Sequence, residues 1–332
     1  MKPCIAVFVG VAIASTALSS TGLSQTLGAD SLRADSSVFF YNLPYFTAEN
    51  DTLWLDYYPA AVPTDAPTIL FVHGGGFYTG TYRNFSISSY CDSLRQWGYN
   101  VASMQYHLHL QGQDFHCNQP IANKIRAVEV CVRDIHRASA YLTAPKDSVL
   151  TPANGVVLIG SSAGAEAALH AVYWSKDRPF LESSPFPTDS VGYRGVVAFA
   201  GALEDTTLVV RENVLPTALF HGTCDPLVPF ETDIHHYCPE RTPGAWILHG
   251  SKSIADQLKR LDASYYLHVA CGLGHEVAGR PMVQQIAETV LFIRTAVEQS
   301  ARQQTTVVVP GTSDCPETSY GPCLQPTIPS RD

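Results

Sequence analysis

The chain has 332 residues, 45% of them hydrophobic and 15% charged, which is typical of a globular protein with a sizeable core. Its formal charge is −9, and its 21 lysines and arginines form no basic run, so nucleic acid is disfavoured as a partner. The length allows one large domain or two small ones.

The N-terminus has the layout of a secretory signal peptide. Met1-Lys2 precedes an apolar run from Cys4 to about Leu18, and small polar residues follow the run. The run is short for a membrane span, and no other segment is long enough for one. We therefore predict a signal peptide over residues 1–24, whose removal would leave a secreted or periplasmic protein without a membrane span. An uncleaved membrane anchor is the alternative.

Short apolar strands alternate with helices along residues 38–302, after a loose lead-in over 25–37. Two leading strands, with no helix between them, are expected at 38–41 and 52–58. Later strands are expected at 68–72, 100–106, 156–159, 195–200, 217–221 and 264–269, and helices at 86–97, 121–142, after Gly164, 251–261 and 281–298. This pattern predicts one α/β domain of about eight mostly parallel strands, with an antiparallel leading pair and helices on both faces.

The tail over 303–332 is Pro-rich, and we expect it to be an extended appendage. Eight cysteines remain once the signal is removed, and an even number in an exported chain predicts disulfides. They are Cys91, Cys117, Cys131, Cys224, Cys238, Cys271, Cys315 and Cys323. Cys315 and Cys323 bracket a tail segment and are expected to hold it. Cys224 is expected to pair with Cys271 or Cys238, and the sequence leaves the connectivity open.

The most informative stretch is Gly160-Ser161-Ser162-Ala163-Gly164, which fits G-x-S-x-G between a predicted strand and a predicted helix. A serine at the tip of such a tight turn is forced outward, and the small residues around it let strand and helix approach closely. The start of the helix adds backbone N–H groups and a partial positive charge. The motif predicts that Ser162 is a nucleophile. A small-residue turn without chemistry is the alternative.

A nucleophilic serine needs a base, and the base needs an acid to hold its tautomer. Asp225 follows the strand expected at 217–221, and His275 follows the strand expected at 264–269. They come after Ser162 in the order serine, acid, histidine. Asp205, at the end of the preceding strand, is a competing acid.

His73-Gly74-Gly75-Gly76-Phe77 follows the strand expected at 68–72. Backbone N–H groups of Gly75 and Gly76, with that of Ala163, are expected to form an oxyanion hole. The run lacks the spacing and the lysine of a phosphate-binding loop.

These motifs together resemble the α/β-hydrolase superfamily, and within it the esterase/lipase group marked by H-G-G-G and G-x-S-A-G. The resemblance covers about residues 38–300. It implies a carboxylesterase without a cofactor, with Ser162 as nucleophile, Asp225 as acid and His275 as base. Many relatives carry Asp or Glu where this chain has Ser161.

The chain lacks a long N-terminal cap and a large insertion after the strand at 195–200, so we expect an open site. This makes it similar to secreted esterases that act on acetylated or feruloylated polysaccharides, with a small-molecule or polysaccharide ester as substrate. The alternatives are a lipase or polyester hydrolase, a prolyl-oligopeptidase-like peptidase, and a non-catalytic binding protein on this scaffold. Candidate substrate-binding residues, which could equally be core, are Phe77, Tyr78, Ser161 and Trp174.

Five histidines lie in two polar loops, near Cys117 and Cys238. They are His107, His109, His116, His235 and His236. A metal site needs three or four converging ligands, so we interpret these histidines as polar loop residues and expect no metal.

Overall fold

The computed structural model of the protein describes residues 39–144, 150, 153–174, 192–311 and 320–323. The predicted signal peptide over 1–24, the lead-in over 25–37 and Cys315 lie outside these residues. Among the described helices, none is long and apolar enough to cross a bilayer.

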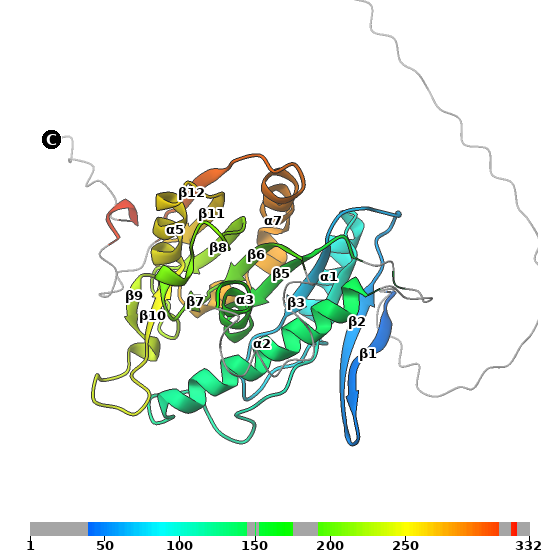
Figure 1. Ribbon diagram of the computed structural model, residues 1–332. Helices are drawn as coiled ribbons and strands as arrows, with labels where there is room; N and C mark the ends of the chain where they lie inside the picture. Colours follow the sequence, from blue (N-terminus) through cyan, green and yellow to red (C-terminus); the bar gives the residue numbers. More distant parts are fainter. Residues whose placement is uncertain (1–38, 145–149, 151–152, 175–191, 312–319, 324–332) are drawn as a thin grey trace, which may run out of the picture. The chain divides into compact units, whose positions relative to one another are not determined.

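A twisted sheet of nine strands, in the order β1-β2-β4-β3-β5-β6-β8-β11-β12, forms the centre of the described chain (Figure 1). The strands are β1 (Tyr41–Ala48), β2 (Asp51–Tyr58), β3 (Thr68–Val72), β4 (Val101–Met104), β5 (Val156–Ser161), β6 (Tyr193–Phe199), β8 (Thr217–Gly222), β11 (Tyr265–Ala270) and β12 (Gln304–Val309). β1 pairs with β2, and β2 with β4, in antiparallel fashion. All other neighbours are parallel. The predicted α/β sheet, mostly parallel with an antiparallel leading pair, is therefore confirmed.

Helices cover both faces of the sheet, as predicted. Alternate residues of β3 point to opposite faces: Leu70 joins one buried cluster, whereas Ile69 and Phe71 join the other. The first face packs against α2 (Ile121–Thr143), α3 (Ala163–Tyr173) and α5 (Ser251–Arg260). The second face packs against α1 (Phe85–Gln96) and α7 (Ile286–Phe292). Burial on both faces explains why the central strands are continuous apolar runs.

Several element boundaries differ from the prediction. The leading strand is β1 over 41–48 rather than 38–41, and it contains Pro44, which lies at a register shift on the edge of the sheet. The helix expected at 281–298 is broken into α6 (Pro281–Gln284), α7 and a π-helical turn, η5 (Ile293–Glu298). Gln304–Val309, expected to be tail, forms β12, a ninth strand parallel to β11.

A second, three-stranded sheet was not predicted. It has the order β7-β10-β9 and consists of β7 (Ala202–Leu203), β9 (Thr232–Ile234) and β10 (Ile247–Gly250). These strands are only two to four residues long, too short for a detectable alternation. The described residues also form short helical turns: η2 (Thr206–Leu208), η3 (His235–Tyr237), η4 (His275–Ala278) and η6 (Gly321–Cys323).

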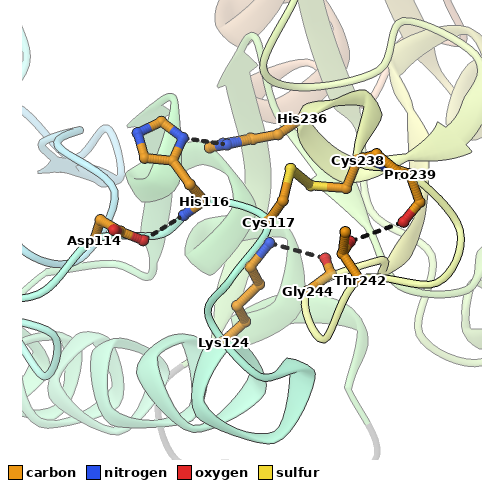
Figure 2. The surroundings of a disulfide bond; sticks show 9 residues. All are labelled: Asp114, His116, Cys117, Lys124, His236, Cys238, Pro239, Thr242 and Gly244. Carbon is orange, nitrogen blue, oxygen red and sulfur yellow. Dashed lines mark hydrogen bonds between the residues drawn. A yellow bond between two sulfur atoms is a disulfide. The ribbon is translucent and has the colours of Figure 1, made fainter.

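The disulfides correct the expected connectivity. Cys117 is bonded to Cys238 (Figure 2), and Cys271 to Cys323, so neither Cys271 nor Cys238 pairs with Cys224, and Cys323 does not pair with Cys315. Cys224 is also disulfide-bonded. The remaining candidates, Cys91 and Cys131, are free thiols fully buried in the two apolar clusters, where each packs as a small hydrophobic residue.

Candidate active site

Four loops meet at one edge of the sheet. They follow β3, β5, β8 and β11, which run parallel, so their carboxyl ends lie at the same edge. The glycine run and Ser162 come directly after β3 and β5, and Asp225 and His275 follow β8 and β11 within five residues. The topology thus brings together residues that are far apart in the sequence.

Ser162 lies at the tip of the sharp turn between β5 and α3. Its φ of 54° and ψ of −126° are rare for a residue with a side chain, and its N–H donates to the carbonyl of Phe199 at 2.8 Å. The flanking glycines permit this turn. A Cβ on Gly160 would lie 2.3 Å from the Gly164 carbonyl oxygen, and one on Gly164 would lie 2.2 Å from that of Val72. The strain at Ser162 is therefore held by close backbone packing.

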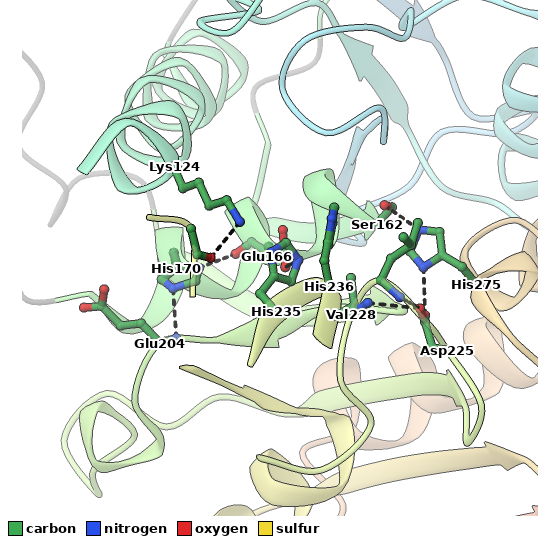
Figure 3. Close-up of polar contacts among 12 residues, drawn as sticks. Lys124, Ser162, Glu166, His170, Glu204, Asp225, Val228, His235, His236 and His275 are labelled. Carbon is green, nitrogen blue, oxygen red and sulfur yellow. Dashed lines mark hydrogen bonds and ion pairs between the residues drawn. The ribbon is translucent and has the colours of Figure 1, made fainter. Parts of the chain in front are cut away.

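A continuous hydrogen-bonded chain joins the serine, the histidine and the acid (Figure 3). Ser162 Oγ lies 2.7 Å from His275 Nε2, and His275 Nδ1 lies 2.7 Å from Asp225 Oδ2. This geometry would allow the ring to accept a proton from the hydroxyl on one side while the carboxylate orients the ring from the other.

The carboxylate of Asp225 is fully buried and fixed by its neighbours. Its Oδ1 accepts backbone N–H groups of Leu227 at 2.9 Å and Val228 at 3.0 Å. Burial alone would raise the pKa of Asp225, but hydrogen bonds and charge from His221 and His275 hold that pKa well below its usual range. Asp225 therefore stays ionised.

The pKa of His275 is raised. Burial lowers it, but the hydrogen bond and charge of Asp225 outweigh burial, and Glu166 and Glu276 add to the increase. The imidazolium form is thus stabilised next to the serine.

Asp205, the competing acid in the sequence, lies elsewhere. Its side chain caps η2 by accepting the Thr207 N–H at 2.8 Å, and this bond lowers its pKa. Asp205 is therefore a helix-capping residue.

The glycine loop borders the same site. Gly75 and Gly76 have φ values of 121° and 60°, which favour glycine. His73 anchors the loop: its Nδ1 lies 2.7 Å from the Gly74 carbonyl oxygen, and its ring stacks on Tyr106 at 4.3 Å. Burial lowers the pKa of His73 to about 4, so the ring is neutral and its N–H donates to that carbonyl.

The serine opens into a cavity of about 350 Å³. The lining residues include the three glycines and Ala163, together with Ser162 and His275. The others are Tyr78, Phe115, His116, Ser161, Glu166, Leu227, Val228, His235, His236 and Ala278. Aromatic and aliphatic walls thus enclose a few polar groups, as is usual for a small-molecule site.

Two of the four predicted substrate-binding residues line this cavity. Tyr78 and Ser161 do, and Ser161 Oγ also donates to the Ala278 carbonyl at 2.8 Å. Phe77 and Trp174 are not among its lining residues. Phe77 is fully buried against Phe115, and Trp174 is 5% exposed, with its ring 4.4 Å from that of His170. Both belong to the core.

The polar wall of the cavity was not predicted from the sequence. Glu166 follows Ser162 by four residues in α3, so one helical turn places it on the same face, and this spacing could have revealed it. His235 and His236 come from η3, a three-residue turn that is too short to show a periodic pattern. Beside them, His116 Nδ1 lies 3.1 Å from His236 Nδ1 (Figure 2), next to the Cys117–Cys238 disulfide.

Across the described part of the chain, no group of three or more His, Cys, Asp or Glu side chains could hold a metal ion. His107 instead bridges two carboxylates, with Nδ1 2.6 Å from Asp134 and Nε2 2.7 Å from Asp51.

Comparisons with known proteins agree with this architecture. Residues 55–207 match the model of the BD-FAE family, in which the letters stand for bifunctional acetyl xylan esterase/feruloyl esterase. No curated protein matched the sequence. Among solved structures, the chain is similar to Thermogutta terrifontis esterase 2. For the apo form the TM-score is 0.50 at 20% identity, covering 80% of this chain and 97% of that one. For the butyrate-bound form the TM-score is 0.50 at 18% identity, and the match covers 76% of this chain and 94% of the esterase. At these identities the structural matches show the fold alone.

A strand–serine–helix turn, a following aspartate and histidine, and a glycine loop at one edge of this sheet define an α/β hydrolase with the layout of an esterase. The matching family model is one of esterases. The chain therefore resembles the esterase/lipase group of the α/β-hydrolase superfamily in fold, in motifs and in its family match over residues 55–207, and it is a carboxylic ester hydrolase.

Proposed function

We propose that the protein is an exported serine carboxylesterase that hydrolyses short-acyl esters, with acetyl or feruloyl esters of polysaccharides as the substrate class. The observation that carries this proposal is the hydrogen-bonded chain from Ser162 through His275 to Asp225, with links of 2.7 Å on both sides of the ring. The family model over residues 55–207 supports the acetyl and feruloyl assignment.

In the proposed reaction, Ser162 Oγ attacks the ester carbonyl carbon and its proton passes to His275 Nε2. Negative charge then develops on the carbonyl oxygen, where the N–H groups of Gly75, Gly76 and Ala163 would stabilise it. Each such donor is typically worth about 3 kcal/mol. The His275 proton goes to the departing alcohol, and water, activated by the same ring, releases the acid from Ser162.

The size and lining of the cavity favour short acyl groups. A space of about 350 Å³ that contains Glu166 and His235 suits an acetyl group with part of a sugar, or one aromatic acyl group, better than a long alkyl chain. Export is supported by the sequence of residues 1–24 and by the disulfides. We take residues 38–302 as the catalytic domain, to which β12 adds the edge strand.

The test is a chain-length series of p-nitrophenyl acetate, butyrate, octanoate and palmitate, measured with the parent and with Ser162→Ala. Ser93→Ala, on α1, is the matched control. Since a pocket discriminates by about 1–3 kcal/mol per methylene, the activity of the parent should fall steeply with chain length. Ser162→Ala should lose all activity, whereas Ser93→Ala should keep it. A maximum at palmitate would favour a lipase instead. Absence of activity on every ester would refute the esterase proposal and favour the binding-protein alternative.

The substrate class needs a second readout. Release of acetate from acetylated xylan, and of ferulate from methyl ferulate, should both depend on Ser162. Cleavage of a prolyl peptide without cleavage of these esters would favour the peptidase alternative.

A further inference from the structure

Two buried ionisable side chains line the cavity next to the serine but take no part in the proposed reaction. Glu166 lies one helical turn beyond Ser162 on the same face of α3 and is 2% exposed. His235 lies in η3 and is 1% exposed, and its backbone N–H donates to the Trp246 carbonyl at 2.7 Å. Both side chains line the cavity that contains Ser162.

The two side chains face each other without satisfying each other. Glu166 Oε1 lies at an ion-pair distance of 3.1 Å from His235 Nε2 (Figure 3), but the geometry does not make a hydrogen bond. Within the residues that the structure describes, Glu166 Oε1, His235 Nδ1 and His235 Nε2 have no hydrogen-bond partner. Buried polar atoms are normally paired, so these three mark a place for a polar group.

A buried lysine interacts electrostatically with Glu166. Lys124, fully buried in α2, donates from Nζ to the Gly244 carbonyl at 3.0 Å (Figure 2). Burial lowers the pKa of Lys124 to about 8, while the charges of Glu166 and Asp114 act to raise it. Glu166 also lies in the first turn of α3, where the helix dipole favours a carboxylate.

The chemistry of the pair selects its ligand. An ionised carboxylate only accepts hydrogen bonds, whereas a neutral imidazole donates from one nitrogen. A hydroxyl group can donate to Glu166 Oε1 while it accepts from His235. A methyl group can do neither and would leave Glu166 Oε1 and both ring nitrogens of His235 buried without a hydrogen bond.

We propose that Glu166 and His235 form a subsite of this cavity that binds a hydroxyl group of the ester substrate. This inference rests on the proposed esterase function and deepens it. The hydroxyl can belong to the departing alcohol, as in a sugar, or to the acyl group, as in a phenolic or hydroxy acid. A site built to hydrogen-bond a hydroxyl rejects an analogue without it far more strongly than an apolar pocket rejects an extra methylene.

Two matched ester pairs test the subsite and identify the source of the hydroxyl. On the alcohol side, 2,3-dihydroxypropyl acetate is compared with propyl acetate. On the acyl side, p-nitrophenyl 3-hydroxybutyrate is compared with p-nitrophenyl butyrate. The parent protein should favour the hydroxylated member of at least one pair by about tenfold or more in kcat/KM.

The double variant Glu166→Leu/His235→Leu replaces both polar groups together, which avoids leaving one of them buried alone. In this variant the preference should fall to about twofold or reverse. Glu166→Gln, which keeps the shape of the side chain but not its charge, should lower the preference for the hydroxylated ester at least about threefold. Glu129→Gln, on α2 beside Arg126, is the matched control and should keep the parental ratio.

Equal rates within both pairs in the parent would overturn the subsite, whether or not the variants fold. A preference in the parent that persists in Glu166→Gln and in the double variant would also overturn it. The esterase proposal fails separately: it is refuted if the parent hydrolyses neither p-nitrophenyl acetate nor any of the four paired esters.

Discussion

Replacing Asp225 with asparagine tests most directly the hydrogen-bonded chain from Ser162 through His275 to Asp225. The variant keeps the shape of the side chain and changes only its hydrogen bonding. In the parent, Asp225 Oδ1 accepts the N–H groups of Leu227 and Val228, and Oδ2 lies 2.7 Å from His275 Nδ1. The two backbone donors require an oxygen, so the amide oxygen of the introduced asparagine is expected to take that side. The amide NH₂ then faces His275.

The consequence is a change of tautomer. An NH₂ group can only donate to His275 Nδ1, so the ring proton moves to Nε2, the nitrogen 2.7 Å from Ser162 Oγ. That nitrogen can then no longer accept the serine proton. Loss of the correct tautomer in a serine relay lowers kcat by about 10⁴-fold, which corresponds to roughly 5.4 kcal/mol of transition-state stabilisation.

The assay is steady-state hydrolysis of p-nitrophenyl acetate, with urea unfolding to verify that the variant folds. Asp205→Asn is the matched control and should keep parental kcat, since Asp205 caps η2. Because Asp225 helps raise the pKa of His275, any residual activity of the variant should have its acidic limb at lower pH than the parent. A folded Asp225→Asn variant that loses less than tenfold in kcat would refute this reasoning.

Two further predictions concern stability. The double variant Cys117→Ser/Cys238→Ser removes a crosslink between residues 121 positions apart, and the free energy of unfolding, measured in urea, should fall by about 2–5 kcal/mol; a change below about 0.5 kcal/mol would contradict this. Hydrogen bonding to Asp134 raises the pKa of His107 in the folded state, and Asp51 adds to this although burial opposes it. The resulting stabilisation is present below the unfolded pKa of about 6.5 and is lost as pH rises through the raised pKa, so His107→Gln should show a smaller loss of stability than the parent between pH 6 and pH 9. Equal losses in the two proteins would show that His107 contributes nothing to this pH dependence.

Most of the sheet, and the grouping of the candidate site, could be predicted because both follow from local signals. The buried strands β3, β5, β8 and β11 are short apolar runs, and a residue suited to catalysis, or the glycine run, follows each of them within five residues. The carboxyl ends of parallel strands lie at one edge of a sheet. Knowing that Ser162, Asp225 and His275 each follow such a strand was therefore enough to predict that they lie close together.

The wall of the cavity could not be predicted in the same way. It depends on residues between β8 and α5, where strands of three and four residues carry no usable period. His235 and His236 therefore looked like ordinary loop residues. Phe77 and Trp174 lie close in sequence to the predicted site, but both rings are buried in the core. Proximity in sequence does not decide whether an aromatic ring points into the cavity or into the core.

The disulfides show the same limit. Cys271 and Cys323 meet at the end of β11, and Cys117 and Cys238 meet beside the cavity, across sequence separations of 52 and 121 residues. Spacing along the chain carries no information about such contacts. The edge strand β12 was assigned to the tail because of the prolines around it, although Val307, Val308 and Val309 are β-branched.

The G-x-S-x-G pattern leads to a final prediction, because its last glycine couples the serine turn to the glycine loop. A Cβ on Gly164 would lie 2.2 Å from the carbonyl oxygen of Val72 and 2.5 Å from that of His73. Both are backbone atoms at the end of β3, where the glycine loop begins. In Gly164→Ala, the start of α3 must therefore move away from that loop, and Ser162 moves with it.

Overpacking of this kind typically costs about 1–3 kcal/mol of stability, and misplacing a reacting group by about 1 Å can cost about 10²-fold in rate. We expect both losses in Gly164→Ala, measured by urea unfolding and by kcat on p-nitrophenyl acetate. Gly321→Ala is the control, since a Cβ there meets nothing within 4 Å. A Gly164→Ala variant with parental stability and parental kcat would mean that close approach of α3 to β3 does not position the serine against the oxyanion donors.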